Sequence, residues 1–314
     1  MKARRVASAP SMPTDSFTLD RGSFSLFVHR FLPEGEPIGV VQVAHGMAEH
    51  AARYARFAGA LNEAGYAVYA SDHRGHGRSA SDASLGHFGD EGGWRAMVGD
   101  LCALAEHLRT QHPGKPLTLF AHSMGSFMAL DALVHEGPSR WDKVVLSGSD
   151  AVGGPMVKVG KQLAKLERMR DGKEGKSALL SFMSFGSFNA AFKPTRTPFD
   201  WLSRDEVEVD KYVADPRCGF RITNQSWVDF LDGLYRTGRD GYGGVMPKRL
   251  PMFIFAGSRD PVGKAGSGVR KLVEQLREGG LTEVTEKLYP EARHEMLNET
   301  NREQVTADVL SFLG

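Results

Sequence analysis

The chain has 314 residues, 41% of them hydrophobic and 25% charged, which is ordinary for a globular protein. Its 39 basic residues nearly balance 38 acidic ones, so the net charge of +1 predicts no nucleic acid or other polyanionic partner. Two cysteines, Cys102 and Cys218, are too few for a disulfide scaffold. We expect both thiols to be reduced and mostly buried.

The N-terminus is basic, but no apolar run of signal-peptide length follows Arg4 and Arg5. Nowhere does the sequence approach the roughly 18 apolar residues of a membrane span. We therefore expect a flexible tail over residues 1–15 and a cytoplasmic protein.

Short apolar runs then alternate with helical patterns along most of the chain. Strands that are apolar on both faces and alternate with helices predict a mostly parallel sheet covered by helices on both sides. The expected strands are 16–19, 24–31, 39–44, 67–70, 116–120, 143–146, 252–255 and 284–288, and the expected helices are 51–64, 94–108, 124–135, 266–278 and 304–312.

This rhythm breaks between residues 150 and 234, where the sequence is helical and rich in phenylalanine and tryptophan. We predict an inserted helical cap, or lid, over 150–234. The α/β core would then consist of residues 16–149 and 235–314.

The strongest local motif surrounds Ser123, where a predicted strand runs directly into a helix. That context is required of the nucleophile elbow of α/β hydrolases, with the pattern G-x-S-x-G. Small residues are needed two positions either side of the serine, and Ala121 and Gly125 stand there. Ala121 departs from the usual glycine but is still small, so we expect Ser123 to be the nucleophile.

A serine nucleophile needs a base and an acid that orients the base, and in this fold both follow it in the chain. Asp260 lies just beyond the strand 252–255, and His294 lies in the loop after the strand 284–288. Because the carboxyl ends of parallel strands meet at one edge of the sheet, we predict that Ser123, Asp260 and His294 form a catalytic triad. The oxyanion would be held by the backbone N–H groups of Met124 and Met47.

Other residues are candidates for the same roles. Asp150 follows the strand after the elbow and could supply the acid instead, whereas His122 should point away from Ser123. His73 and His76 lie in a loop without any known zinc spacing, so a bracing role is favoured over a metallohydrolase site. The remaining loop histidines precede the serine, which is the wrong order for the base: His45, His50 and His87.

Three segments together resemble the monoacylglycerol lipase and lysophospholipase branch of the α/β hydrolases, which is related to the S33 serine aminopeptidases. They are H-G-M-A-E-H-A-A-R-Y at 45–54, D-H-R-G-H-G-R-S at 72–79 and H-S-M-G at 122–125. The resemblance covers about residues 16–313. It implies the α/β-hydrolase fold, the triad and oxyanion donors named above, no cofactor and no metal.

The resemblance also implies hydrolysis of single-acyl glycerolipid esters through an acyl-enzyme, with a small-molecule lipid ester as partner. Three alternatives stay open: a broad short-chain carboxylesterase, a serine aminopeptidase, and a binding protein without catalysis.

In the cap, residues 156–176 carry seven Lys or Arg against three Asp or Glu. This segment is either a solvated amphipathic helix that packs on the core through Val159, Leu163 and Leu166, or a basic surface at the entrance of the site that contacts membranes peripherally. The phenylalanine-rich segment 179–192 would either line a tunnel for the acyl chain or form the hydrophobic core of the cap.

Overall fold

The computed structural model describes residues 15–137, 140–242 and 246–314. The predicted tail therefore lies outside the described residues, apart from Asp15, which begins the first strand.

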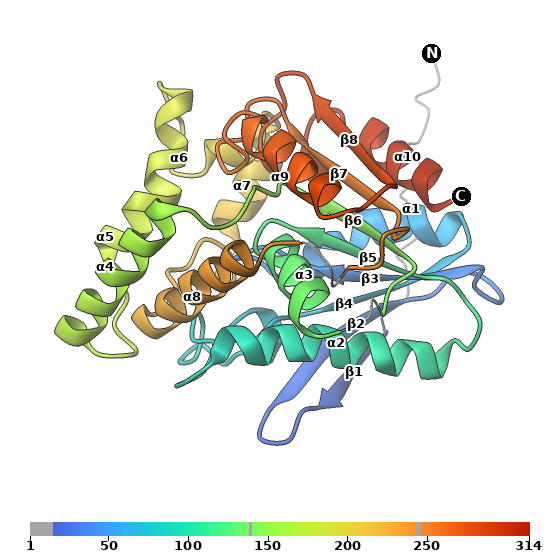
Figure 1. Ribbon diagram of the computed structural model, residues 1–314, viewed down its shortest axis with the longest axis horizontal. Coiled ribbons are helices and arrows are strands. Elements are labelled where there is room, and N and C mark those ends of the chain that lie inside the picture. Colours follow the sequence, from blue (N-terminus) through green and yellow to red (C-terminus); the bar gives the residue numbers. More distant parts are fainter. Residues whose placement is uncertain (1–14, 138–139, 243–245) are drawn as a thin grey trace, which may run out of the picture.

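One sheet of eight strands runs through the molecule in the order β1-β2-β4-β3-β5-β6-β7-β8 (Figure 1). The pairs β1/β2 and β2/β4 are antiparallel, and every other neighbouring pair is parallel. This confirms the mostly parallel sheet that the alternating pattern predicts. The strands are β1 (Asp15–Asp20), β2 (Ser25–Phe31), β3 (Gly39–Ala44), β4 (Tyr66–Ser71), β5 (Leu117–His122), β6 (Lys143–Ser147), β7 (Met252–Gly257) and β8 (Val284–Tyr289).

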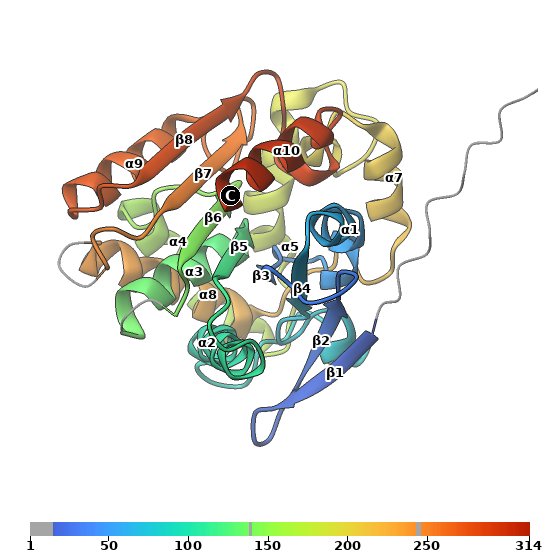
Figure 2. The ribbon, with the colours of Figure 1, turned by 90° about the vertical axis from the view of Figure 1, so that its right-hand side faces the viewer.

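Helices cover both faces of the sheet, as Figure 2 shows. On one face, residues such as Val144 and Leu146 pack with α2 (Gly93–Gln111), α3 (Met124–His135) and α9 (Ser267–Glu278). Val145, between them in β6, faces the other way and packs with α1 (Ala55–Glu63) and α10 (Arg302–Leu313). Because successive side chains of a strand alternate between faces, an entirely apolar strand serves two cores at once.

Between β6 and β7 the described residues form helices and no strand. They are α4 (Pro155–Asp171), α5 (Ala178–Ser181), α6 (Ser187–Asn189), α7 (Glu206–Ala214) and α8 (Asn224–Asp240). These helices stand together beside the sheet in Figure 1. The helix α8 runs through residue 234, where we placed the end of the cap, so the boundary in sequence falls inside a continuous helix. Among the described residues, no helix combines the length and apolar character needed to cross a membrane.

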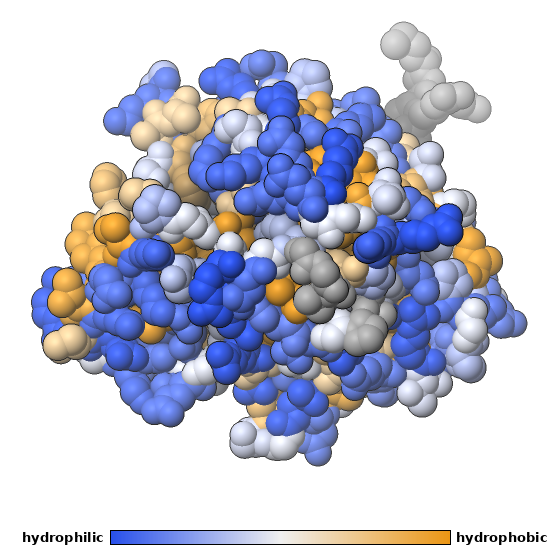
Figure 3. Space-filling view, viewed as in Figure 1, coloured by the Kyte–Doolittle hydropathy of each residue, from blue (hydrophilic) through white to orange (hydrophobic). Residues whose placement is uncertain are grey.

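The helix α4 packs against α8, but by only part of the apolar face that the sequence suggests, since Leu163 packs on the core. Val159 and Leu166 are 57% and 59% exposed, and the residues of α4 that are buried are Ala164 and Glu167. Apolar side chains therefore gather on the outer surface of this part of the molecule, at the left of Figure 3.

A buried carboxylate ties α8 to the core. Asp131 of α3 is fully buried and accepts hydrogen bonds from Trp94 Nε1 of α2 (2.9 Å) and from Arg236 (2.5 Å) and Thr237 (3.1 Å) of α8. Removing it would leave three donors, one of them charged, without their acceptor.

We expect Asp131→Ala to lower the free energy of unfolding by about 3–5 kcal/mol, as for other buried ion pairs that lose one partner. The measurement is urea unfolding followed by circular dichroism. Glu106→Ala, which removes an exposed ion pair with Arg140, is the control and should cost no more than about 0.5 kcal/mol. Equal losses in the two variants would contradict this account.

Candidate active site

Ser123 occupies a sharp turn between β5 and α3. Its backbone has φ 50° and ψ −117°, a conformation that side-chain-bearing residues rarely adopt. The turn brings the start of α3 against the end of β3: a Cβ on Gly125 would lie 2.3 Å from the carbonyl oxygen of Ala44. Glycine is therefore required at position 125, whereas the methyl group of Ala121 is accommodated in the core.

His294 and Asp260 are brought together from the loops that follow β8 and β7. The imidazole Nδ1 lies 2.9 Å from Asp260 Oδ2 and 3.0 Å from Oδ1, and both residues are almost fully buried. Asp260 Oδ1 also accepts the backbone N–H of Val262 at 2.9 Å. Burial alone would lower the pKa of His294, but the Asp260 carboxylate outweighs it, so the pKa is raised above its usual value.

The structure does not bring Asp150 to His294. Its carboxylate instead forms an ion pair with Lys264, at 2.7 Å from Oδ2 to Nζ. The desolvation of Asp150 raises its pKa despite that partner.

Ser123 and His294 line one cavity together with Gly46, Met47 and Trp201. The loop that carries Met47 lies directly on the serine, since a Cβ on Gly46 would be 3.2 Å from the Ser123 Cβ. Met47, Ser123 and Met124 also share the wall of an adjoining cavity. The five residues selected from the sequence thus converge on one place, although they come from four separate loops.

His122 lies differently from our expectation. Its ring lines the same cavity as Ser123 and rests against His294, with 4.7 Å between ring centroids. The non-extended turn at Ser123 interrupts the alternation of the strand, so neighbouring side chains face the same space. Burial and the nearby His294 lower the pKa of His122 to about 4, so it is neutral at pH 7.

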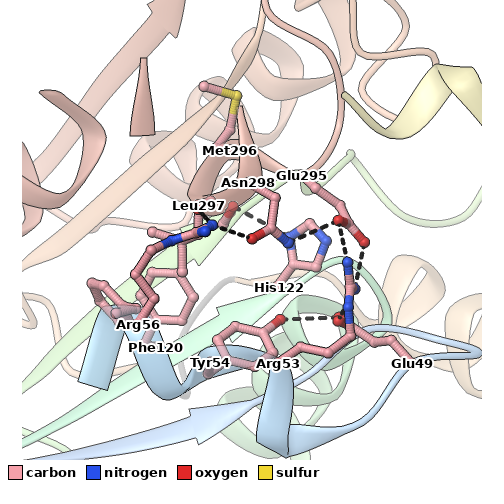
Figure 4. A pocket seen from close by; sticks show the side chains of 12 residues that line it. Glu49, Arg53, Tyr54, Arg56, Phe120, His122, Glu295, Met296, Leu297 and Asn298 are labelled. Carbon is pink, nitrogen blue, oxygen red and sulfur yellow. Dashed lines mark hydrogen bonds and ion pairs between the residues drawn. The ribbon is translucent and has the colours of Figure 1, made fainter. Parts of the chain in front are cut away.

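A buried ion network, shown in Figure 4, borders this cavity and was missed at the level of sequence. Arg53 donates at 2.6 Å to Glu49 and, through both of its Nη atoms, to Glu295. Glu49 also accepts the backbone N–H of Gly46 at 2.6 Å, which fixes the loop beside Ser123. Burial alone would raise the pKa of Glu295, but Arg53 lowers it to about 2, so Glu295 is ionised.

Two of the three members of this network carry a signal in the sequence. Glu49 and Arg53 belong to the 45–54 segment that we singled out, but Glu295 lies 242 residues from Arg53. Its one distinguishing feature is that it directly follows His294.

Three histidines of the first half form a buried cluster under the site: His45, His73 and His76. His45 Nε2 accepts the backbone N–H of His73 at 3.0 Å, and His73 Nε2 lies 3.1 Å from the carbonyl oxygen of His45. His76 Nε2 accepts the backbone N–H of Ala48 at 3.2 Å. Burial lowers the pKa of His73 to about 4 and that of His76 to about 3. They therefore brace the loop as neutral rings. Over the described part of the chain, neither belongs to a set of three potential metal ligands.

An apolar cavity of about 90 Å³ opens at Ser123 on the side of α6, α8 and the turn of helix before α6 that carries Ser184 and Phe185. Phenylalanine and tryptophan side chains from both the helical insertion and the core form its wall: Phe127, Phe185, Phe188, Trp201, Trp227 and Phe230.

Neither cysteine forms a disulfide. Cys102 is buried in α2, as expected, and burial raises its thiol pKa to about 12. Cys218 is only partly buried and lies in the turn after α7.

Comparisons with known proteins agree with this arrangement. A sequence model of the family described as serine aminopeptidase, S33 matches residues 35–301. The monoacylglycerol lipase of Mycolicibacterium smegmatis is 31% identical over 301 residues, which cover 90% of this chain and 90% of that protein. The monoglyceride lipase of Mus musculus is 27% identical, over 88% of this chain and 85% of its own.

Solved structures show the same architecture. A thermostable carboxyl esterase from Bacillus coagulans, crystallised with glycerol, superimposes with a TM-score of 0.85 at 28% identity, over 96% of this chain and 98% of its own. A monoglyceride lipase variant from Saccharomyces cerevisiae shares the fold with a TM-score of 0.71 at 19% identity, over 97% of both chains. The chain has the α/β-hydrolase fold and belongs to the serine aminopeptidase S33 family.

Proposed function

We propose that the protein hydrolyses the ester bond of single-acyl glycerolipids, namely monoacylglycerols or lysophospholipids, through an acyl-enzyme on Ser123. The observation that carries the proposal is the position of Ser123 between an almost wholly apolar cavity and a mixed one. The first is the cavity lined by phenylalanine and tryptophan side chains. The second adds the polar side chains of Glu49, Tyr212 and Glu295 beside His294 to apolar neighbours such as Leu202.

An ester with one long chain and one polar alcohol matches this division. The acyl chain would enter the apolar cavity, and the glycerol hydroxyls would face the carboxylates and the phenol. A second acyl chain on the glycerol would have to lie among buried charged groups, which is unfavourable. Relatives that carry the names monoacylglycerol lipase and monoglyceride lipase support the same substrate class.

In the first half of the reaction, Ser123 Oγ attacks the ester carbonyl carbon and His294 Nε2 takes the hydroxyl proton. Asp260 holds Nδ1–H and stabilises the imidazolium that forms. The N–H groups of Met47 and Met124 stabilise the oxyanion. The C–O bond to glycerol then breaks, and His294 gives its proton to the departing alcohol.

In the second half, His294 removes a proton from a water molecule, which attacks the acyl carbonyl carbon. Collapse of the second oxyanion breaks the bond to Ser123 Oγ, which takes the proton back from His294. The fatty acid is released, and the enzyme returns to its starting state without a cofactor.

We further propose that α4 to α7 and the first part of α8 form a cap that meets lipid surfaces. Met169 of α4 and Phe182 beside α5 are 78% and 68% exposed. Residues 156–176, which include Met169 and end six residues before Phe182, carry an excess of four positive charges, from seven basic and three acidic residues. Exposed apolar side chains among basic residues are typical of helices that lie in the interface of anionic membranes.

The decisive experiment is covalent labelling with a fluorophosphonate probe, which reacts with activated serines. We expect stoichiometric labelling of the wild-type protein and none of Ser123→Ala, because Ser123 lies at the elbow and shares its cavity with the paired base His294. Ser126→Ala, which alters the neighbouring buried serine on α3, is the matched control and should still label. A folded wild-type protein that does not label would refute the proposed catalysis.

Substrate class is decided by a panel of esters and amides measured as kcat/KM. We expect monoacylglycerols with long chains to exceed short-chain esters, and diacylglycerols and aminoacyl amides to react poorly. Activity that falls steadily as the chain lengthens would favour a short-chain carboxylesterase instead.

Asp260→Asn should lower kcat by about 10⁴-fold, because the acid orients the base and stabilises its charged form. Asp150→Asn is the control and should leave kcat near the wild-type value.

In the wild type, the raised pKa of His294 means that the imidazole is protonated, and so inactive as a base, until the pH exceeds the usual histidine pKa of about 6.5. The acid limb of the pH profile of kcat/KM should therefore have its midpoint above about 6.5. A midpoint well below that value, or a normal rate in Asp260→Asn, would contradict the assignment.

Replacing Met169 and Phe182 by glutamate should weaken binding to vesicles that contain phosphatidylglycerol by at least about tenfold, because both apolar anchors and local positive charge are lost. Vesicle sedimentation measures this, and hydrolysis of a water-soluble ester should be unchanged. Ile38→Glu changes another exposed apolar residue, at the amino end of β3, and should bind as the wild type does. Equal binding of all three proteins would exclude membrane contact through α4 and α5.

A further inference from the structure

Three potential metal ligands of different chemistry meet beside the loop that carries Met47. His50 lies at the end of that loop, and Asp215 and Cys218 lie in the turn that follows α7. One nitrogen, one carboxylate oxygen and one sulfur from these residues all lie within 4.8 Å of one another. In the described parts of the chain, this is the one such group.

The turn presents two of the three ligands together. Cys218 N donates to the carbonyl oxygen of Asp215 at 3.0 Å, so the carboxylate and the thiol project from the two ends of one tight turn. The spacing Asp-x-x-Cys equals that of the Cys-x-x-Cys turns that hold structural zinc. Asp215 Oδ1 accepts the backbone N–H of Arg217, which leaves Oδ2 directed at His50 Nε2, 2.8 Å away.

We propose that His50, Asp215 and Cys218 form a binding site for a zinc-like divalent cation. Zinc binds imidazole nitrogen, carboxylate oxygen and thiolate sulfur at about 2.0–2.3 Å, so tetrahedral ligand atoms stand roughly 3.3–3.8 Å apart. Small side-chain rotations bring the three atoms to that separation, and water completes the fourth position. The thiolate disfavours Mg²⁺ and Ca²⁺, which take oxygen ligands.

Access and local charge both favour a cation. All three residues are partly buried, so solvent reaches them while their positions stay defined. Glu49 and Glu295 lie within electrostatic reach of the Cys218 thiol, as does the guanidinium of Arg53. The Asp215 carboxylate adds a third negative charge.

A bound ion would add a cross-link where two segments already meet. Gly219 N and Tyr212 Oη both donate to the carbonyl oxygen of Ala48, at 2.9 and 2.8 Å. Zinc would thus join the turn after α7 to the loop of Met47 by metal–ligand bonds in place of the His50–Asp215 hydrogen bond. The site departs from our expectation of no metal, and it stands independently of the proposed ester hydrolysis.

The test uses the full-length, chelator-treated protein without a histidine tag, titrated with Zn²⁺ by calorimetry and with Co²⁺ by absorption spectroscopy. We expect one ion per chain and, with Co²⁺, the near-ultraviolet charge-transfer band that a thiolate ligand produces. Cys218→Ser should abolish the band and weaken Zn²⁺ binding by at least about 100-fold. His50→Gln should weaken Zn²⁺ binding similarly while keeping the band at saturating Co²⁺.

The matched controls are Cys102→Ser, which removes the other cysteine, and His87→Gln, which alters a half-buried loop histidine elsewhere. Both should bind as the wild type does, and Ser123→Ala should also bind, which separates this site from the catalytic one. Circular dichroism in metal-free buffer verifies that each variant is folded. No Zn²⁺ binding by the wild type, or one-to-one binding that Cys218→Ser leaves unchanged, would overturn the proposal.

Discussion

The close approach of α3 to the end of β3 is the constraint on which the site depends. Gly125 touches the Ala44 carbonyl so closely that no side chain fits between them. That contact holds the first turn of α3 under Ser123 and keeps the serine in its strained turn between strand and helix. It also sets the loop of Gly46 and Met47 on the serine, because the same strand, β3, leads into that loop. Nucleophile and oxyanion loop are therefore positioned by one piece of backbone packing.

Histidine shows how burial and partners decide chemistry in this protein. His73, His76 and His294 are all buried, yet the pKa is lowered in the first two and raised in the third. Both carboxylate oxygens of Asp260 lie within 3.0 Å of the Nδ1 of His294. The loop histidines interact chiefly with backbone groups and with one another. A residue type that recurs along the sequence thus gives structural braces in one loop and a candidate base in another.

The α/β core was predictable because its central strands β3, β4, β5 and β7 are short runs that are buried on both faces. The expected strand 39–44 and helix 124–135 coincide with β3 and α3. The convergence of Ser123, Asp260 and His294 was predictable because parallel strands end at one edge. Glu295 and the position of His122 were not, since they depend on contacts between distant segments and on a turn that breaks strand alternation. The cap was hardest, because α4 packs Leu163 against the core as expected but exposes Val159 and Leu166.

The clamp at Asp131 has a mechanical consequence for the apolar cavity. Through Arg236 and Thr237 it fastens α8 to α2 and α3. The same helix supplies Trp227 and Phe230 to the cavity wall. Those two residues are consequently anchored to the helices that cover the sheet. An acyl chain too wide for the cavity would therefore have to displace Phe185 and Phe188, which form another part of the wall. The cavity therefore has one wall that hydrogen bonds hold to the core and another wall that would have to move to admit a wider acyl chain.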